Sequence, residues 1–591
     1  MNIKRSFRYL PVLTLLFSCG QTATSTPLSS LPSTPDAPSS FSSESSSEEY
    51  TKEYVPTRIK EPTIIEPGIV EFRCTSSSDS YQEKIYDLDE FVFESASFAY
   101  DGKPHSLTIK GMIPLSTRVE YENNTLTEIG SVTAKAKILD EDGNLLDQKE
   151  ATLSIVENVG YPVVSIDTDN TPITDKENYV AMSLTTSNCD AKQVLTEVTG
   201  GIRWRGNGTL TYDKKAYRLK FDSKVNMFGL NDGNKFKSWV LLADYCDQSM
   251  MRNQFAHKIG DSLFNYSGNY ATESRHVSVF LNNEYQGVYL VAEQQQANKN
   301  RINIAEAESD YEGTDIGYLL ELDNYANEED FHFSVGSQWG DQVKGANLAR
   351  KEYSVKTDCY GDAQVPYIKK YLGNVYTAFM RVVKGEGLYV LDDNHDLIAS
   401  PYQGMQETLE SMIDIESLAK AYLLHELIKS VDVGFSSFYL WVDFSANSLY
   451  PRLTFGAPWD FDWSSGNTND ANVAKTNGAY NSTSFQKMNP WLFLFSKTDF
   501  FSSLMPKYYK VFCDSGIFES ALAYIEHDAD AYANEFAANF DKWQILGTIV
   551  PKFTPNDALN FTVHHDAVDH FTNWLTNRKS YLDTAFAMKK A

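Results

Sequence analysis

The sequence of 591 residues predicts an α+β protein in which a small all-β module precedes a large mixed domain. Between residues 68 and 156, apolar and polar residues alternate over short runs separated by turn sequences, a pattern typical of strands. From residue 160 onward, strands come first and runs with helical periodicity follow. Apolar residues make up 42% of the chain and aromatic residues 13%, which is enough for packed cores in both parts.

The first element along the chain is a candidate export signal, residues 1–19. Basic residues precede the short apolar run 9–17, and a small residue stands just before Cys19. The run is too short to span a bilayer as a mature helix, as expected of a cleaved signal. The segment resembles a bacterial lipoprotein signal, which implies a lipid on Cys19 and an anchor at the cell surface, outside the cytoplasm. An ordinary secretory peptide cut nearby is the alternative.

Residues 20–67 are rich in Ser, Thr and Pro and poor in large apolar side chains. Such a segment cannot bury enough surface to offset the entropy lost on ordering, so we expect a disordered tether. No later stretch has some 18 or more uninterrupted apolar residues, and the rest of the chain should lie outside the membrane, held to it through the lipid alone.

The composition excludes some partners. The formal charge is 52 − 79 = −27, which repels the phosphate backbone of nucleic acid and disfavours anionic membrane surfaces. Five cysteines follow Cys19, and they are scattered, odd in number and without a C-x-x-C pair. They therefore predict neither a disulfide framework nor a metal-ligand pattern, and we interpret them as small buried residues.

Within the all-β module, the turn sequences Tyr100–Lys103 and Glu141–Asn144 separate alternating runs such as Val132–Leu139. The order of three motifs resembles the bacterial immunoglobulin-like repeats called MBG domains: Tyr100–His105, Val119–Asn124 and Ala151–Ile155. The resemblance implies a spacer or adhesive module without catalysis. His105, in a turn, is expected to be a hydrogen-bonding loop residue rather than a ligand.

The large domain opens with strands, one of which carries cations on a single face. In the run 214–221, side chains two apart share a face, so Arg218 and Lys220 point one way and the apolar Leu219 the other. Two cations on one face could grip phosphate. The alternative is that they form the solvated side of an antiparallel sheet.

A helix is predicted next. The segment Asp244–Asp247 can cap a helix that starts near Gln248. Spacing by about four residues places one apolar set on the same side of that helix: Met251, Phe255, Ile259 and Leu263.

Two acidic clusters about thirty residues apart are the most informative feature of the large domain. Asp432 is followed five residues later by Ser437, and an apparent β-hairpin then leads to the segment Pro458–Asp462. Phosphoryl transfer needs a carboxylate that orients the attacking hydroxyl and oxygen ligands for a divalent ion. Protein kinases use an Asp, a polar ligand five residues later, a hairpin and an Asp-Phe-Gly step. Here Ser replaces the usual Asn, and Asp462 replaces the glycine. Solvated or capping carboxylates are the alternative.

Many motifs occur in the order seen in the CotH kinase family of bacterial spore-coat and surface lipoproteins, over residues 160–591. Besides the two acidic clusters, the motifs are Arg205–Asn207, Lys214–Phe221, Trp239–Tyr245, Arg252–Asn253, Phe280–Leu290, Arg301–Ile304, Gly317–Asp323, Asn489–Trp491 and Trp574–Arg578. The sequence departs from the family pattern at Gly208, where a hydroxyl residue is common, and at Ser430, where Asn is usual.

The resemblance implies a two-lobed atypical protein-kinase-like domain that holds ATP and a divalent metal between a β-rich lobe and a helical lobe. Asp432 would be catalytic. Ser437, Asp460 and Asp462 would hold Mg²⁺ or Mn²⁺, hard cations that prefer oxygen ligands. The implied ATP-binding residues are Arg205, Asn207, Lys215, Arg218, Lys220 and Glu293. Lys215 and Lys220 remain alternatives for the phosphate contact, and Glu293 lies near the expected hinge.

The expected function is therefore an extracytoplasmic kinase that transfers the γ-phosphate of ATP to Ser or Thr hydroxyls of surface or secreted proteins. The hydroxyls of its own tether are a further hypothetical acceptor. The alternative is a catalytically inactive kinase-like surface lipoprotein that acts in adhesion or as a scaffold. Glycine-rich kinase and P-loop phosphate motifs, a zinc-protease motif and a hydrolase nucleophile elbow are all missing from the sequence.

Overall fold

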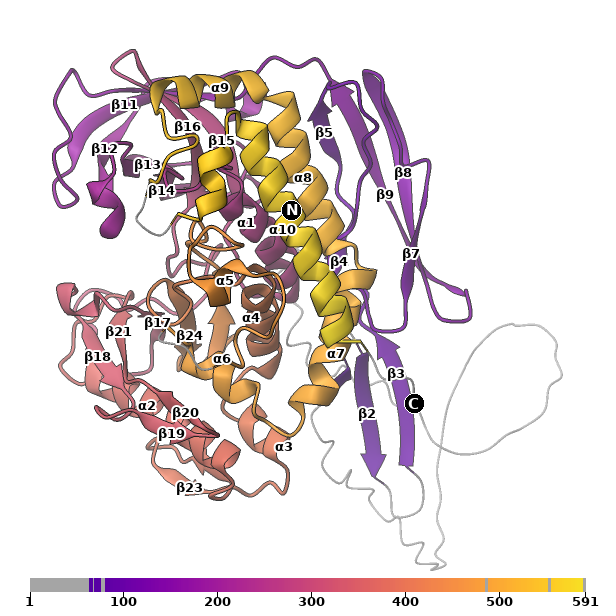
Figure 1. Ribbon diagram of the computed structural model, residues 1–591. Helices are drawn as coiled ribbons and strands as arrows, with labels where there is room; N and C mark the ends of the chain where they lie inside the picture. The colour runs from indigo at the N-terminus through magenta and orange to yellow at the C-terminus, as the bar shows by residue number, and fades with distance from the viewer. Residues whose placement is uncertain (1–62, 67–68, 76–79, 484–486, 551–553, 588–591) are drawn as a thin grey trace, which may run out of the picture. The chain divides into compact units, whose positions relative to one another are not determined.

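The computed structural model describes residues 63–66, 69–75, 80–483, 487–550 and 554–587 (Figure 1). The predicted signal peptide, its lipidation cysteine and nearly all of the predicted tether lie outside these residues. Within them, no helix combines the length and the apolar character needed to cross a membrane.

Internal contacts divide the chain into two units, one of residues 1–63 and 71–84 and one of residues 64–70 and 85–591. The first strands form a three-stranded sheet in chain order: β1 (Thr63–Glu66), β2 (Ile69–Thr75) and β3 (Ser80–Tyr86). All further elements belong to the second unit.

The all-β module contains a two-stranded sheet, β4-β6, and a four-stranded sheet in the order β5-β9-β8-β7. Its strands are β4 (Phe91–Val92), β5 (Ala96–Ala99), β6 (Lys110–Gly111), β7 (Arg118–Glu122), β8 (Gly130–Leu139) and β9 (Leu145–Val156). The alternating run predicted at 132–139 lies within β8, and its residues Ala134, Ala136 and Ile138 are buried in the module core. The immunoglobulin-like assignment of this module stays a prediction.

The large domain begins with a closed seven-stranded barrel in the order β10-β11-β12-β13-β14-β16-β15. The strands are β10 (Val163–Asp167), β11 (Val180–Ser187), β12 (Val198–Arg205), β13 (Ala216–Val225), β14 (Phe236–Leu242), β15 (Ser274–Leu281) and β16 (Glu284–Glu293). A parallel pairing of β10 with β15 closes it. Leu219 is buried in the barrel core while Lys220 is exposed, as the alternation in this strand predicts.

Helix α1 (Arg252–Phe264) connects β14 to β15. The four apolar residues predicted for one side of this helix are all buried. The helix begins at Arg252 and not near Gln248, and its N-cap residue is Met251, which lies outside the predicted capping segment. Asp247 explains the shift, because its side chain accepts hydrogen bonds from the backbone N–H groups of Ser249, at 2.9 Å, and of Arg252, at 3.0 Å.

A five-stranded antiparallel sheet follows in the order β18-β21-β17-β24-β25. Its strands are β17 (Gly317–Leu322), β18 (His332–Val335), β21 (Lys351–Val355), β24 (Phe438–Asp443) and β25 (Thr454–Gly456). Two small hairpins accompany it, β19 (Asp341–Val343) with β20 (Ala346–Leu348) and β22 (Tyr389–Leu391) with β23 (Leu397–Ala399). Strands β24 and β25 are the hairpin predicted between the two acidic clusters.

The remaining elements are helices. They are α2 (Gln364–Lys384), α3 (Met405–Glu410), α4 (Ile415–Ile428), α5 (Ala471–Ala474), α6 (Pro490–Phe495), α7 (Phe501–Asp514), α8 (Ile517–Ala531), α9 (Ala533–Lys542) and α10 (His564–Ala585). One large hydrophobic core contains residues of helices α1, α2 and α4, of the helices from α6 through α10, and of the five-stranded sheet. Met112 and Leu115 of the all-β module are buried in the same core. The predicted mixed α+β class is confirmed.

Candidate functional site

Two chain segments pair at the C-terminal end of α4 and bring the two acidic clusters together. The helix ends at Lys429, whose φ of 47° turns the chain into the left-handed region. The backbone N–H of Val431 then donates to the carbonyl of Trp463, at 2.9 Å, and the N–H of Ser465 donates to the carbonyl of Ile428, at 2.6 Å. These bonds fix the segment that carries Asp432 against the segment that carries Asp460.

Ser437 and Asp460 contact each other directly. The Ser437 hydroxyl donates to Oδ2 of Asp460 at 3.1 Å. Both residues have left-handed backbones, with φ of 62° and 68°. Residues other than glycine reach this region at a cost, and such strain clusters at functional sites. The backbone N–H of Ser437 also donates to Oε1 of Glu321, at 3.2 Å, so the end of β17 holds the strained turn in place.

The Asp460 carboxyl group is accessible to solvent but is surrounded densely by other protein atoms. Desolvation raises its pKa, and the nearby charge of Asp432 raises it further. Arg205 and the Ser437 hydroxyl act in the opposite direction, but the net shift is upward. A carboxyl group in such surroundings gains from a bound cation, because the cation would replace the missing solvation.

Asp432 is held by a cation that the sequence did not single out. The ammonium group of Lys487 forms an ion pair with Oδ1 of Asp432. The same ammonium group lies over the ring of Phe435, 4.5 Å from the centroid, and over that of Trp463, at 5.6 Å. No spacing motif links Lys487 to Asp432, since the two meet only through tertiary folding.

Asp462 lies close enough to Asp460 for the charge of Asp460 to affect its pKa, but it has a different partner. Burial raises the pKa of Asp462 well above its usual value, and the charges of Asp460 and Asp244 add to the rise. The thiol of Cys246 donates to its Oδ2 at 2.9 Å. Among the described residues, therefore, Ser437 and Asp460 are the pair of predicted metal ligands whose oxygen atoms are in direct contact. Asp462 is bonded instead to Cys246, in the segment that precedes α1.

Helix α1 braces the segment 458–464 along its length. The side chain of Asn253 accepts a hydrogen bond from the backbone N–H of Phe461, at 2.6 Å. The Nε of Arg252 donates to the carbonyl of Ser464, at 3.1 Å. Trp459 stacks on the ring of His257, with centroids 5.7 Å apart. The position of Asp460 thus depends on a rigid helix on one side and a strained turn on the other.

A cationic face on the barrel lies near this acidic pair. Arg203 of β12 stands directly opposite Arg218 of β13, and the alternation of a strand places Arg205 and Lys220 on the same face. None of these four side chains forms an ion pair with a described residue. The Nε atoms of Arg203 and Arg218 are buried and lack a hydrogen-bond partner. Buried donors without partners cost free energy unless a ligand satisfies them.

Arg205 links the cationic face to the acidic pair. Its guanidinium group lies over the ring of Trp459, 5.2 Å from the centroid. Desolvation lowers the pKa of Arg205, whereas the negative charge of Asp460 acts to raise it. A phosphate group held by the arginines would therefore lie within reach of a cation bound at Ser437 and Asp460.

The two alternative lysines of the sequence analysis differ in their surroundings. Lys215 donates to the carbonyl of Leu210, at 2.9 Å, and to that of Tyr212, so the backbone already satisfies this ammonium group. Lys220 is exposed on the cationic face. Asn207, at the turn after β12, accepts a hydrogen bond from Lys176 through its Oδ1, at 2.9 Å.

The carboxylate of Glu293 is fully enclosed at the end of β16. It accepts hydrogen bonds from Nε of Arg301, at 3.2 Å, from Nδ2 of Asn231, at 2.5 Å, and from the backbone N–H of Glu273, at 3.1 Å. This side chain therefore stabilises the junction that follows the barrel, and no part of the residue is exposed to solvent.

A family model described as CotH kinase protein matches residues 202–582, from β12 to α10. The chain belongs to the CotH kinase protein family. The match includes all the predicted site residues except Cys19. A comparison with curated proteins gave no match. At the level of the family, the chain is a kinase-like enzyme, and kinases in general use ATP and a divalent metal.

The residues of this CotH kinase protein fit such ligands. The hydroxyl of Ser437 and the carboxylate of Asp460 are hard oxygen donors of the kind that Mg²⁺ and Mn²⁺ prefer. The buried donors of Arg203 and Arg218 that lack partners fit phosphate oxygens. Arg203 is not among the site residues predicted from the sequence, although its spacing of two from Arg205 on a strand is a usable signal.

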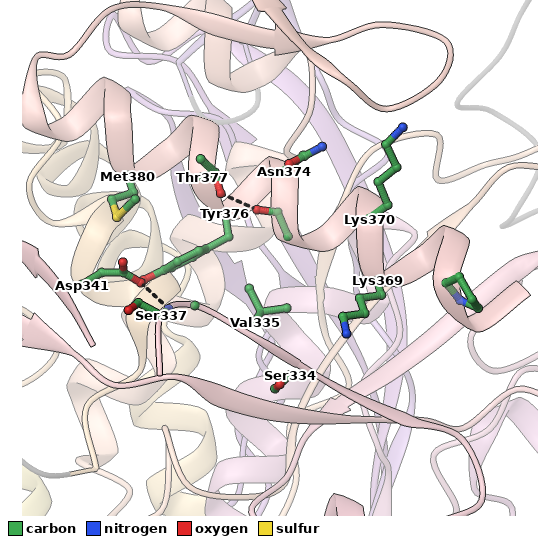
Figure 2. Close-up of a pocket in the computed structure, with 13 residues that line it drawn as sticks. Ser334, Val335, Ser337, Asp341, Lys369, Lys370, Asn374, Tyr376, Thr377 and Met380 are labelled. Atoms are coloured by element: carbon green, nitrogen blue, oxygen red, sulfur yellow. Dashed lines mark hydrogen bonds between the residues drawn. The ribbon is translucent and has the colours of Figure 1, made fainter. Parts of the chain in front are cut away.

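A cavity of about 470 Å³ lies elsewhere in the CotH kinase domain, between β18 and α2 (Figure 2). Its lining includes Lys369, Lys370 and Asn374. Figure 2 shows the Tyr376 hydroxyl directed at Asp341, to whose Oδ2 it donates at 3.2 Å. None of the predicted site residues lines this cavity.

Proposed function

We propose that this protein is a metal-dependent kinase that transfers the γ-phosphoryl group of ATP to Ser or Thr hydroxyls of surface or secreted proteins, outside the cytoplasm. The observation that carries the proposal is the contact of Ser437 with Asp460 beside a cationic face whose buried donors lack partners. Family membership gives the general reaction class.

Each group then has a role that its surroundings favour. Asp432 would accept the proton of the acceptor hydroxyl, whose oxygen attacks the γ-phosphorus while the bridging oxygen leaves with ADP. Lys487 would hold the Asp432 carboxylate in position through their ion pair. Arg205 and Arg218 would neutralise phosphate oxygens.

Ser437 and Asp460 would hold Mg²⁺ or Mn²⁺, and a bound ion of this kind offsets the charge of the phosphates. Asp462 is a further candidate ligand. To bind the ion, its carboxylate would have to give up the hydrogen bond that it accepts from the Cys246 thiol. Of the remaining ATP contacts that the family resemblance implies, Asn207 and Lys220 are exposed, whereas Lys215 is held by backbone carbonyls and Glu293 is enclosed.

The location forms part of the proposal. The N-terminal sequence supports export and lipid attachment at Cys19, and the tether supports a reach away from the membrane. Acceptors would then be proteins at the same surface, or the Ser and Thr hydroxyls of the tether itself. An inactive scaffold remains the second candidate function, since a fold alone does not establish catalysis.

The deciding experiment incubates the purified full chain with γ-labelled ATP and Mn²⁺ or Mg²⁺, with and without a basic acceptor protein. Asp460→Asn keeps the size of the side chain but removes its charge, and it should lower incorporation of label by roughly 100-fold or more. Asp142→Asn, in the turn before β9 of the all-β module, is the matched control and should be unaffected. Equal label in wild type and Asp460→Asn would leave only the scaffold function.

The tether hypothesis has its own readout. Mass spectrometry of residues 20–67 should find phosphate on the wild-type protein and none on Asp460→Asn. Equal phosphate in both proteins would remove the tether as an acceptor while leaving transfer to other proteins open to the first experiment.

A further inference from the structure

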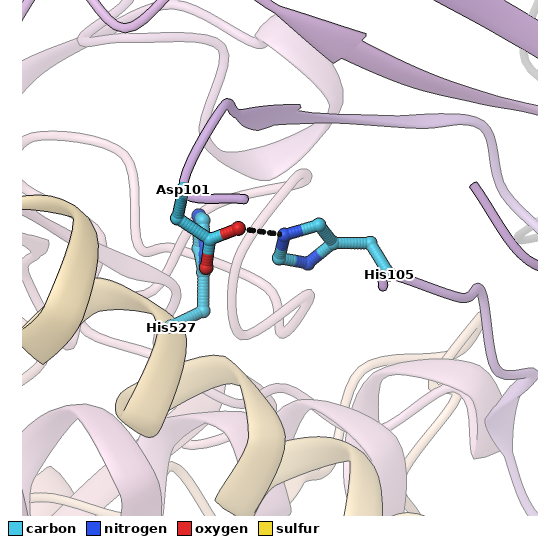
Figure 3. A group of neighbouring side chains, drawn as sticks. All are labelled: Asp101, His105 and His527. Carbon is cyan, nitrogen blue, oxygen red and sulfur yellow. Dashed lines mark hydrogen bonds and ion pairs between the residues drawn. The ribbon is translucent and has the colours of Figure 1, made fainter. Parts of the chain in front are cut away.

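Three titratable side chains meet where the all-β module contacts helix α8, away from the site described above (Figure 3). Asp101 and His105 come from the turn that follows β5, and His527 comes from α8. Figure 3 shows both imidazole rings beside the Asp101 carboxylate. Only 5% of the Asp101 side chain is exposed, 8% of His105 and 9% of His527, so the cluster is enclosed by protein.

The ligand atoms of the cluster converge. Nε2 of His105 lies 2.7 Å from Oδ1 of Asp101, and Nδ1 of His527 lies 3.4 Å from Oδ2. One atom from each residue lies within 4.8 Å of the other two. The hydrogen bond predicted for His105 is therefore confirmed, but the contact of His527 is long for a hydrogen bond and leaves room between the three groups.

The buried carboxylate of Asp101 needs a positive charge. Its side chain is almost fully enclosed, and it accepts hydrogen bonds from the backbone N–H of Lys103, at 2.9 Å, and from the His105 ring, at 2.7 Å. A buried carboxylate is stable only when it is paired or bound to a metal.

Among the described residues, the ion-pair partners of Asp101 are the two histidines and not a lysine or an arginine. The ammonium group of Lys103 is turned to the surface, where it pairs with Asp530. Asp530 and Glu526 make the neighbourhood acidic, and Asp530 also pairs with His565 at 3.1 Å. The cluster itself offers two sources of positive charge next to the carboxylate, a protonated imidazole and a bound cation.

The chemistry of the three donors decides between these two sources. A single protonated imidazole would be enough to neutralise the Asp101 carboxylate. Here two imidazole rings, one from the turn after β5 and one from α8, lie against that carboxylate. Phe98 stacks on the His105 ring, with centroids 4.7 Å apart, and packs edge-on against His527 at 5.4 Å, so a dry aromatic wall closes one side. Two imidazole nitrogens and one carboxylate oxygen are a donor set typical of zinc.

We propose that Asp101, His105 and His527 bind a divalent transition-metal ion of the zinc class. Ligand atoms at the usual bond lengths of about 2.0–2.2 Å from a tetrahedral ion lie roughly 3.3–3.5 Å apart, so modest side-chain rotations would close the site. A water molecule would take the fourth position.

Such an ion would clamp the all-β module to the helices. Nearby contacts already join the two: the Thr108 hydroxyl donates to Ser520 at 2.6 Å, and the side chain of Asn158 donates to the carbonyl of Ala531 at 2.9 Å. The backbone of His105 is fixed by paired hydrogen bonds with Leu126, at 2.8 and 3.0 Å, so one ligand is rigid before the ion binds. The place of the site between two elements suits an ion that holds them together, although three protein ligands are one fewer than structural zinc sites usually have.

The test uses the full chain, freed of metal with a chelator and titrated with Co²⁺ and then Zn²⁺ in excess Mg²⁺. Tetrahedral Co²⁺ gives strong visible absorption, and one equivalent per chain should produce it and Zn²⁺ should displace it. Zinc should also raise the melting temperature by about 3 °C or more. The titration is repeated on Asp460→Asn, which removes the proposed kinase metal and should leave both signals intact.

His527→Gln should abolish the absorption and the zinc-dependent shift, whereas His565→Gln, which lies on α10 outside the cluster, should keep both. Circular dichroism checks that each variant is folded, and His105→Gln supplies a second variant should His527→Gln fail that check. Absence of the Co²⁺ signal in wild type, or its persistence in a folded His527→Gln or His105→Gln protein, would overturn the proposal. A stability that depends on pH but not on zinc would favour the protonated imidazole instead.

Discussion

At the scale of single residues, the arginines of the barrel differ in how much they depend on a ligand. Arg218 has a buried Nε without a partner, whereas Lys220, two residues on along the same face, is exposed. A buried cation that lacks partners gains more from a bound phosphate than a solvated one does.

Arg218→Gln should therefore weaken ATP binding by roughly 10-fold or more, as expected for loss of a charged hydrogen bond. Lys220→Gln, the matched change on the same strand, should weaken it by less than about 3-fold. Titration with a fluorescent ATP analogue measures both. Equal losses in the two variants would argue against a special role for the buried Nε of Arg218.

His425 makes stability depend on pH. It is buried in α4 against Phe438 and Phe461, its Nδ1 has no partner, and desolvation lowers its pKa to about 3. Between pH 6.5 and about 3, the unfolded chain binds a proton at this residue that the folded chain does not. Stability is therefore lost as the pH falls below 6.5, by at most about 1.4 kcal/mol per pH unit.

His425→Gln removes this titration while keeping a side chain of similar size. Relative to the variant, the wild type should lose about 2 kcal/mol of unfolding free energy between pH 7 and pH 5. Urea denaturation at the two pH values measures the difference. Parallel losses in both proteins would contradict the assignment to His425.

Individual site residues were predictable from the sequence to different degrees. The pairing of Ser437 with Asp460 could be predicted from the kinase-like spacing. The hairpin of β24 and β25 lies between the two residues, and its second strand brings the chain back beside Ser437. Lys487 gave no signal, since its contact with Asp432 depends on tertiary folding. Lys215 could not be judged either, because the carbonyls that satisfy it belong to a local turn that composition does not predict.

At the scale of elements, glycines set how closely segments approach. A Cβ on Gly434, two residues after Asp432, would lie 2.3 Å from the backbone carbonyl oxygen of Met488. That carbonyl is part of the segment that presents Lys487, so a side chain at Gly434 would separate the members of the Asp432 ion pair. By contrast, a Cβ on Gly373 in α2 would meet no atom within 4 Å.

Gly434→Ala should cost about 1–3 kcal/mol of stability, the usual range for overpacking, and should reduce phosphoryl transfer as well. Gly373→Ala is the control and should stabilise the protein by up to about 1 kcal/mol through helix propensity. Thermal denaturation and the labelled-ATP assay report the two effects. A Gly434→Ala protein as stable and active as Gly373→Ala would show that the close approach is not needed.

Element types were easier to predict than element ends. Three of the four apolar residues predicted for one side of this helix, Phe255, Ile259 and Leu263, lie in α1 and are buried. They could be predicted because helical spacing is a local property, whereas Met251 immediately precedes the helix. Its start was displaced, since Asp247 caps Ser249 and Arg252 through a loop that precedes the helix. The closed barrel was not foreseen, because the pairing of β10 with β15 joins strands far apart in the sequence.

At the scale of the whole molecule, the all-β module and the large domain share a core. Met112 and Leu115 are 5% and 4% exposed and belong to the same apolar cluster as α1 and α8. The predicted boundary between residues 156 and 160 would therefore cut through a packed region if the two parts were separated.

A chain that starts at residue 160 should melt at a lower temperature than one that starts at residue 86, because removal of the module exposes this cluster. Leu115→Ala in the full chain should cost about 2–5 kcal/mol through the same contacts. Differential scanning calorimetry measures both. Equal melting temperatures for the two truncated chains would mean that the shared cluster adds nothing to stability.

Closure of the barrel also bears on how copies of the protein behave in concentrated solution. A sheet closed on itself presents no free strand edge, so β10 to β16 offer no template for edge-to-edge aggregation. In the four-stranded sheet of the module, β7 is an outer strand, and it carries Arg118, Glu120 and Glu122. Charges along an outer strand discourage the addition of a foreign strand, so the closed barrel and the β7 edge of the module both disfavour self-association.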